Sequence, residues 1–238
     1  MPESAQMVTP AQRKWLPWLT AVGFFMQTLD GTILNTALPS MAETLGESPL
    51  QMQSVVIAYM LTVALLIPAS GWLADRFGTR RIYLAAILLF TLGSLACAAA
   101  NTLPMLVAAR VLQGVGGALL MPIGRLAVLR VYSKHELLRV MSFVTIPGLV
   151  GPLIGPALGG WLVEVASWHW VFLINLPVGI LGFIASWYFM PDLRQGTATF
   201  DWQGFVMFSA GMVLVSVGLQ GLGEHSISTG WALFALLF

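Results

Sequence analysis

Charged residues are scarce in this sequence. Asp, Glu, Lys and Arg together fill 9% of its 238 positions, and the 11 basic residues nearly balance the 10 acidic ones. A soluble domain of this length needs more polar surface than these residues provide. Hydrophobic residues fill 58% of the chain and the mean hydropathy is +0.84, so we expect a protein of the lipid bilayer. The net charge of +1 carries no information about nucleic acid, and we expect no nucleic-acid partner.

Cysteine and histidine are almost missing as well. Cys97 is the single cysteine, which excludes an intrachain disulfide, and the three histidines lie far apart in the sequence. The chain also lacks the HExxH and GxSxG motifs, and the charged residues deep within its apolar runs are one carboxylate and one arginine. We therefore expect no metal, no cofactor and no enzymatic activity.

Long apolar stretches divide the chain into membrane spans. A helix needs about 20 residues to cross a hydrocarbon core about 30 Å thick, and its backbone must form its hydrogen bonds within the segment. The sequence therefore predicts an all-α polytopic membrane protein. Seven windows have the required length: Trp15–Leu38, Val55–Leu73, Ile82–Ala100, Leu103–Gly124, Val140–Val163, Trp170–Met190 and Trp202–Leu222.

Basic residues occupy alternate connections between these windows. The other connections, on the opposite side of the predicted membrane, contain no Lys or Arg. This positive-inside pattern predicts that the N-terminus lies in the cytoplasm. The residues concerned are Arg13, Lys14, Arg76, Arg80, Arg81, Arg125, Arg130, Lys134, Arg139 and Arg194.

The last apolar run is too short for a span. It begins at Trp231 and reaches Phe238, and eight helical residues cover only about 12 Å. We interpret it as a truncated eighth span and expect the chain to be a fragment of a longer protein. The predicted regions are a cytoplasmic N-terminus at 1–14, a six-span bundle at 15–190, a cytoplasmic linker at 191–201 and extra spans at 202–238.

Asp30 and Arg110 interrupt the first and fourth windows. An ionisable side chain at mid-membrane costs about 2.5–3.5 kcal/mol on insertion scales, so it is rarely without a role. Asp30 precedes Leu38 by eight residues and Arg110 follows Leu103 by seven, which places both about 10–12 Å below the same membrane boundary. The two charges either fix helix packing as a structural pair, or Asp30 carries protons.

Four other side chains lie within about one helical turn of these charges. A cavity lined by them would be part polar and part apolar, and methionine adapts to varied apolar ligands. Ordinary helix packing is the alternative for each. The four predicted cavity residues are Met26, Gln27, Leu34 and Gln113.

Glycine gathers in a predicted turn and in the fifth window. The segment GWLADRFGTRR at 71–81 predicts a tight turn between the second and third spans, in which Asp75 caps or pairs locally. Small residues every three or four positions let the fifth span pack closely, or let it move as a seal. The residues are Gly71, Asp75, Arg76, Gly78 and Arg80 in the turn, and Gly148, Gly151, Pro152, Gly155, Pro156 and Gly159 in the fifth span.

Five segments resemble motifs of the major facilitator superfamily, in particular its 14-span drug:proton antiporter branch. They occur in the family's order and on the corresponding spans. Thr79 and His169 depart from the pattern, because basic residues are usual at both positions. The segments are LDGTILNTALP at 29–39, GWLADRFGTRR at 71–81, RVLQGVGGA at 110–118, GLVGPLIGPALGG at 148–160 and WHWVFLINLPVG at 168–179.

This resemblance implies the N-terminal half of a major facilitator fold: a six-helix bundle, helix seven and a truncated helix eight. It implies proton-coupled efflux of small amphipathic or cationic compounds across a bacterial inner membrane, with Asp30 and Arg110 as the proton-coupling residues. The expected partners are the lipid bilayer, protons, a small-molecule substrate and the missing C-terminal half. Asp75, Arg76 and Arg80 would stabilise a state that is closed at the cytoplasmic side.

Other classes of protein remain open. The chain could be an inactive transporter fragment or a half-transporter that works as a homodimer. A seven-span receptor fits the helix count, but no lysine follows Lys134 to bind retinal, and a cytoplasmic N-terminus is opposite to the usual receptor arrangement.

Overall fold

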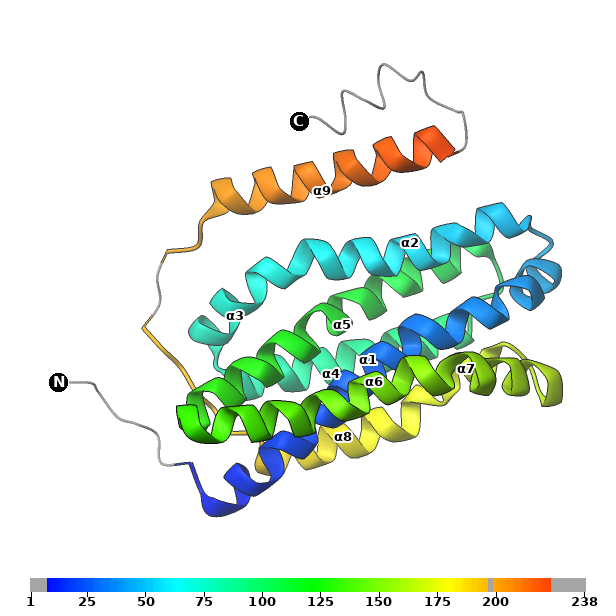
Figure 1. Cartoon of the computed structure of the whole chain (residues 1–238). Helices are drawn as coiled ribbons and strands as arrows, with labels where there is room; N and C mark the ends of the chain where they lie inside the picture. Colours follow the sequence, from blue (N-terminus) through cyan, green and yellow to red (C-terminus); the bar gives the residue numbers. More distant parts are fainter. Residues whose placement is uncertain (1–7, 197–198, 224–238) are drawn as a thin grey trace.

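All regular structure in residues 8–196 and 199–223, the ranges that the computed structural model describes, is helical. The helices lie side by side as long rods (Figure 1). The predicted eighth span at Trp231–Phe238 lies outside the described residues. The bounds are α1 Pro10–Leu45, α2 Pro49–Leu66, η1 Ile67–Ala69, α3 Ser70–Phe77, α4 Thr79–Ala98, α5 Leu103–Val131, α6 Lys134–Val165, α7 His169–Leu173, α8 Asn175–Phe189 and α9 Trp202–Gly223.

The rods coincide with the seven predicted windows. The segments α2, η1 and α3 form one rod, and α7 and α8 form another around Ile174. Five rods have the length and hydropathy of a membrane span, and α9 is apolar over Trp202–Val215. Helix α1 is long enough but is less apolar, because Asp30 and neighbouring polar side chains interrupt it. The all-α membrane architecture is therefore confirmed.

Capping side chains start the first two rods before their apolar windows begin. The hydroxyl groups of Thr9 and Ser48 accept hydrogen bonds from the backbone N–H groups of Gln12 and Gln51. Each glutamine side chain accepts one in return from the backbone N–H of its cap residue. These capping boxes satisfy donors that a helix start leaves free, and a proline at the first helical position has no donor to satisfy.

Glycines on α6 let this helix lie directly against α1. A Cβ added at Gly151 would lie 2.5 Å from Thr28 Oγ1 and 2.8 Å from the backbone nitrogen of Leu29. Because real side chains do not approach this closely, only glycine fits, and the small-residue repeat serves helix packing. The facing pairs are Gly148 with Phe24, Gly151 with Thr28, Gly155 with Thr32 and Gly159 with Thr36.

Helix α5 uses glycine in the same way on two sides. A Cβ at Gly116 would lie 2.6 Å from the carbonyl oxygen of Ala86 in α4, and one at Gly117 would lie 2.7 Å from the hydroxyl oxygen of Tyr59 in α2. The bundle therefore contains two tightly packed helix pairs, α1 with α6 and α4 with α5. Helix α9 lies along the outer side of α2, apart from the other rods (Figure 1).

Two apolar cores fill the two ends of the bundle. One includes Met41 and Phe172, and the other includes Leu16 and Tyr83. The residues that lie between these cores along α1, α4, α5 and α8 are polar and buried. They are Asp30, Ser94, Arg110, Gln113 and Asn175.

The turn between α3 and α4 is shorter than predicted. Helix α3 continues to Phe77 and α4 begins at Thr79, so Gly78 alone reverses the chain, with φ at +94°. Most of the segment 71–81 is therefore helix and not loop. The reason is that the N–H of Gly78 still bonds to the carbonyl of Ala74, at 2.8 Å, and glycine tolerates the positive φ that follows.

Replacing Gly151 by leucine should destabilise the bundle by about 1–3 kcal/mol, as overpacking usually does, because the new side chain would overlap α1. The free energy of unfolding in detergent measures the effect. Gly160→Leu is the matched control on the same helix, since nothing lies within 4 Å of a Cβ there. Equal losses in the two variants would contradict a tight α1–α6 contact.

Candidate functional site

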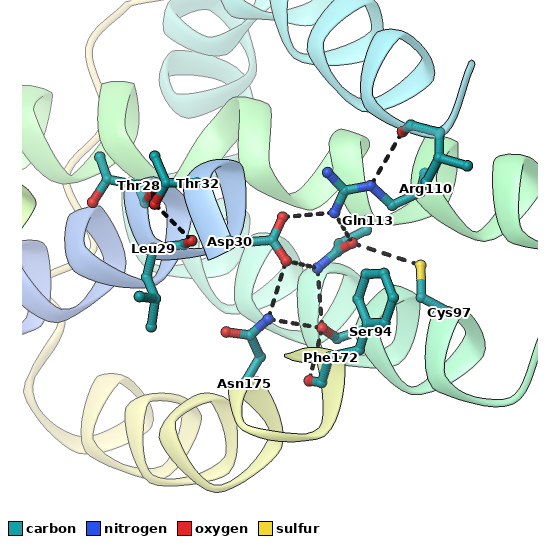
Figure 2. A network of polar contacts seen from close by, with 11 residues as sticks. Thr28, Leu29, Asp30, Thr32, Ser94, Cys97, Arg110, Gln113, Phe172 and Asn175 are labelled. Carbon is teal, nitrogen blue, oxygen red and sulfur yellow. Dashed lines mark hydrogen bonds and ion pairs between the residues drawn. The ribbon is translucent and has the colours of Figure 1, made fainter. Parts of the chain in front are cut away.

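Asp30 of α1 and Arg110 of α5 form an ion pair inside the bundle. Arg110 Nη1 lies 2.6 Å from Asp30 Oδ2, and each side chain is only 1% exposed. Figure 2 shows the two side chains meeting between their helices. A buried pair of this kind is tolerated while both charges are present, but removing one partner leaves an uncompensated charge in an apolar surrounding.

Neutral side chains surround the other carboxylate oxygen of Asp30. Gln113 Nε2 donates to Oδ1 at 2.8 Å, and Asn175 Nδ2 donates to it at 3.1 Å. Both amide groups also donate to Ser94 Oγ at 3.0 Å, and that hydroxyl donates to the carbonyl of Phe172 at 3.2 Å. Helices α5 and α8 therefore contact the Asp30 carboxylate of α1 directly, and Ser94 of α4 is joined to it through the two amide groups (Figure 2).

The guanidinium group of Arg110 has partners besides Asp30. Nη1 donates to Gln113 Oε1 at 2.7 Å, and Nε donates to the carbonyl of Val55 at 3.4 Å. Its Cζ lies 4.1 Å from the centre of the Tyr59 ring, where a cation is attracted to the aromatic face. Arg110 is thus anchored to α2 and to its own helix independently of Asp30.

Every hydrogen bond of Asp30 to another side chain is one that the carboxylate accepts. Arg110, Gln113 and Asn175 all donate to it. An ionised carboxylate accepts hydrogen bonds only, whereas a protonated one carries a donor of its own. The three donors therefore favour the ionised carboxylate, because a protonated one would have fewer acceptor positions to offer them.

The four predicted cavity residues have different surroundings in the structure. Gln113 lies in the polar site, and Leu34 lies in one of the apolar cores. Met26 lines an apolar pocket between α1, α4 and α8. The Oε1 atom of Gln27 is buried and has no hydrogen-bond partner among the described residues. Of the four, only Gln113 hydrogen-bonds to the ion pair. Whether the four line one substrate cavity stays a prediction.

Asp75 pairs across the bundle and not locally. Arg130, near the end of α5, donates from Nη2 to Asp75 Oδ1 in α3, although the two residues are 55 positions apart. The expectation of a local cap was wrong, because α3 packs against α5 and brings the carboxylate to that helix. Arg76 lies over an aromatic ring of its own helix, and Arg80 donates to the carbonyl of Trp187 in α8.

Thr79 ties the turn to the segment that follows α8. Its hydroxyl donates to the carbonyl of Pro191 at 2.8 Å and accepts from the N–H of Leu193 at 3.0 Å. The side chain is fully buried, so the basic residue that is usual in the family pattern would not fit in this arrangement. Gly78 lies against Asp192 of the same segment, whereas Gly71 has nothing within 4 Å of an added Cβ.

Sequence reasoning does not single out Ser94, Asn175 or Arg130. Asn175 has a usable signal, because it is the only amide side chain in the apolar window Trp170–Met190. Ser94 has none, since small hydroxyl residues are common in membrane helices and often bond to their own backbone. Arg130 is hidden among the other basic residues that the positive-inside pattern already explains.

The chain is similar to known proteins over nearly its whole length. A model of the Major Facilitator Superfamily matches residues 20–238. The "Putative multidrug resistance protein MdtD" of Pectobacterium atrosepticum is 56% identical over 97% of this chain and 49% of that protein. MdtD of Klebsiella pneumoniae is 57% identical over 93% of this chain and 47% of that protein. The chain thus spans about half the length of the curated relatives that it matches.

Crystal structures of the peptide transporter POT are similar in fold. The one in complex with sulfate has a TM-score of 0.68 at 20% sequence identity, covering 94% of this chain and 49% of that one. The one in complex with alafosfalin has a TM-score of 0.66, covering 87% of this chain and 46% of that one. At this identity the likeness is one of fold alone.

Arg110→Met should lower the free energy of unfolding by about 3–5 kcal/mol, because it leaves the carboxylate of Asp30 buried without its partner. Titration with a denaturing detergent, followed by circular dichroism, measures the loss. The double variant Asp30→Asn/Arg110→Met should recover part of it, since no buried charge then remains.

Arg13→Met provides the control for this experiment. Arg13 pairs with Glu136 at 2.6 Å, but these two side chains are 48% and 44% exposed. Exposed pairs contribute only about 0–1 kcal/mol, so the control should be nearly neutral. Similar losses in Arg110→Met and Arg13→Met would show that burial of the pair does not matter.

Proposed function

This chain belongs to the Major Facilitator Superfamily, and we propose that it forms part of an exporter that moves small amphipathic or cationic compounds against an inward flow of protons. Its bundle is half of the fold of a transporter family, so it is neither an enzyme nor a receptor. The buried pair of Asp30 and Arg110 is the observation that carries the proposal. The MdtD relatives are named as multidrug resistance proteins, which supports drug-like compounds as the substrates.

Asp30 is the proposed proton-binding residue. In the paired state its carboxylate accepts from Arg110, Gln113 and Asn175, and protonation would remove both the charge and one acceptor site. Arg110 would keep its contacts with α2, so the ion pair can open without stranding the guanidinium group. A proton that enters down the membrane potential gains about 2.3 kcal/mol per 100 mV, which can bias the opening.

Separation of Asp30 from Arg110 would weaken the contact between the α1–α6 and α4–α5 helix pairs. Asp30 belongs to the α1–α6 pair, whereas Arg110, Gln113 and Ser94 belong to the α4–α5 pair. The glycine contacts within each pair leave no room for internal sliding, so we expect each pair to move as a unit. The polar layer between them is then where proton binding changes the shape of the bundle.

The end of the bundle that holds the N-terminus is proposed to face the cytoplasm. It carries the basic residues of the alternate connections, in agreement with the positive-inside rule. Two long-range contacts fasten this end, from Asp75 to Arg130 and from Arg80 to the carbonyl of Trp187. We expect both contacts to stabilise a state that is closed to the cytoplasm.

The substrate cavity is proposed to form between this bundle and a second one. The curated relatives are about twice as long as this chain, and major facilitator transporters enclose substrates between two such halves. Helix α6 presents the exposed apolar side chains Ile146, Leu149 and Leu153, which would face the second half or lipid. The present residues therefore account for proton binding and for one wall of the cavity.

Asp30→Asn should abolish proton-driven efflux, because asparagine keeps the shape of the side chain but does not titrate. The measurement uses a chimera that joins residues 1–238 to the remaining half of the Klebsiella pneumoniae MdtD and follows dye efflux from energised cells. Glu164→Gln is the control, since this carboxylate lies exposed near the end of α6. Undiminished, gradient-dependent efflux by the Asp30→Asn chimera would remove Asp30 from the mechanism.

The 238-residue chain by itself should give no transport in proteoliposomes, because one wall of a cavity cannot enclose a substrate. Dye uptake is measured with an imposed pH gradient, and empty liposomes set the background. Uptake above that background would favour a homodimeric half-transporter instead.

A further inference from the structure

An apolar groove beside α1 plays no part in the proposed proton step. It is a pocket of about 300 Å³ between α1, α4 and α8. Trp15 and Trp18, both exposed, line it near the start of α1, and the buried Met26 lines it deeper along the helix. Tyr83 closes its floor from α4, and its hydroxyl donates to the carbonyl of Leu19 at 2.7 Å.

The groove has the length of one membrane leaflet. The residues of α1 that line it recur every three or four positions and therefore form one stripe. Eleven residues separate Trp15 from Met26, which corresponds to a rise of about 16 Å. This matches half of a hydrocarbon core about 30 Å thick. A hydrocarbon chain that enters beside the tryptophans would therefore end near the middle of the membrane.

A second pocket at the same end of α1 carries two positive charges. It has a volume of about 220 Å³ and lies between α1 and α6, with Lys14 and Arg139 above an apolar floor that includes Phe143. Trp18 lines both pockets and meets the Phe143 ring edge-on at 4.7 Å between centres. The charged pocket and the apolar groove therefore adjoin across one side chain.

The two cations are available to a ligand. In the described part of the chain no carboxylate lies within 4 Å of Lys14 or Arg139. The nearby Glu136 is already engaged, because it accepts from Arg13 at 2.6 Å and from the Ser133 hydroxyl at 2.7 Å. An anion is thus the ligand that this pocket favours, and a cationic compound would be repelled.

A buried hydroxyl group adds a polar position inside the groove. Ser186 of α8 lines the pocket and is fully buried, and its Oγ has no hydrogen-bond partner among the described residues. It lies one turn before Phe189, whose ring stacks on Trp15 at 5.5 Å between centres. Tryptophan favours the membrane interface, so this hydroxyl lies just below headgroup level, where lipid ester groups are found.

We propose that the apolar groove between α1, α4 and α8 and the adjoining charged pocket between α1 and α6 together bind one anionic phospholipid. Its phosphate lies between Lys14 and Arg139, and one acyl chain passes Trp18 and ends against Met26. The proposed function places the basic end of the bundle at the cytoplasm, so the lipid would belong to the inner leaflet, and only this assignment rests on the proposed function.

The test measures quenching of tryptophan fluorescence by lipids with brominated acyl chains, in the 238-residue chain held in nanodiscs. Brominated phosphatidylglycerol should quench more strongly than brominated phosphatidylcholine at equal mole fraction. Lys14→Gln/Arg139→Gln should weaken phosphatidylglycerol binding roughly 5-fold for each charge removed. Arg81→Gln/Arg125→Gln, two exposed cations that line neither pocket, should change it less than about twofold.

A second variant tests the apolar groove separately. Gly182 lines it, and nothing lies within 4 Å of a Cβ there, so Gly182→Leu should fill the groove without disturbing the fold and should reduce quenching. Gly160→Leu is its control, and circular dichroism checks that each variant keeps its helix content. Inorganic phosphate should not displace the lipid, because it lacks the acyl chain.

Three results would overturn the proposal. Equal quenching by the two lipids would show that the groove does not prefer an anionic headgroup. Equal losses in the two double variants would show that general surface charge, and not Lys14 and Arg139, attracts the lipid. Unchanged quenching in Gly182→Leu, or displacement of the lipid by inorganic phosphate, would show that no acyl chain binds in the groove. Asp30→Asn should leave lipid binding unchanged, so a failure of the proton-transport proposal can be told apart from a failure of this one.

Discussion

The ion pair between Asp30 and Arg110 is the interaction on which the rest of the structure depends. It lies in a polar layer that separates two apolar cores, so neither charge can reach water without opening the bundle. Such a pair contributes little net stability compared with apolar packing of the same volume, whereas half of it is strongly destabilising. The stability of the fold therefore depends on the pair as a whole, because the bundle tolerates both charges together or neither of them.

Helix packing places the ion pair between the α1–α6 helix pair and the α4–α5 helix pair. Glycine contacts hold α1 to α6 and α4 to α5 with almost no free space, and the polar layer connects the two pairs. Three donors converge on Asp30, while Arg110 retains a carbonyl and an aromatic ring of α2. In the proposed function, a change of charge at Asp30 would therefore alter the contact between the two helix pairs and leave the contacts within each pair intact.

Both charged regions at the basic end depend on partners distant in sequence. Asp75 meets Arg130 because α3 packs on α5, and the buried Thr79 holds the segment after α8 in place of an exposed basic side chain. Lys14 and Arg139 are brought together because α1 and α6 are parallel neighbours. The basic residues at this end of the bundle thus stabilise contacts between helices and line a pocket suited to an anion, besides forming the positive-inside pattern of the sequence.

Composition and the spacing of apolar windows were sufficient to predict the helices, their number in the described ranges and the common level of Asp30 and Arg110 along the bundle. These properties follow from the thickness of the bilayer and the rise of a helix, which are local and periodic. Only the tertiary structure decided that Asn175 and Ser94 complete the site and that Asp75 pairs with a distant arginine. Such contacts depend on how each helix is rotated about its axis, and that rotation is set by side-chain packing between helices far apart in the sequence.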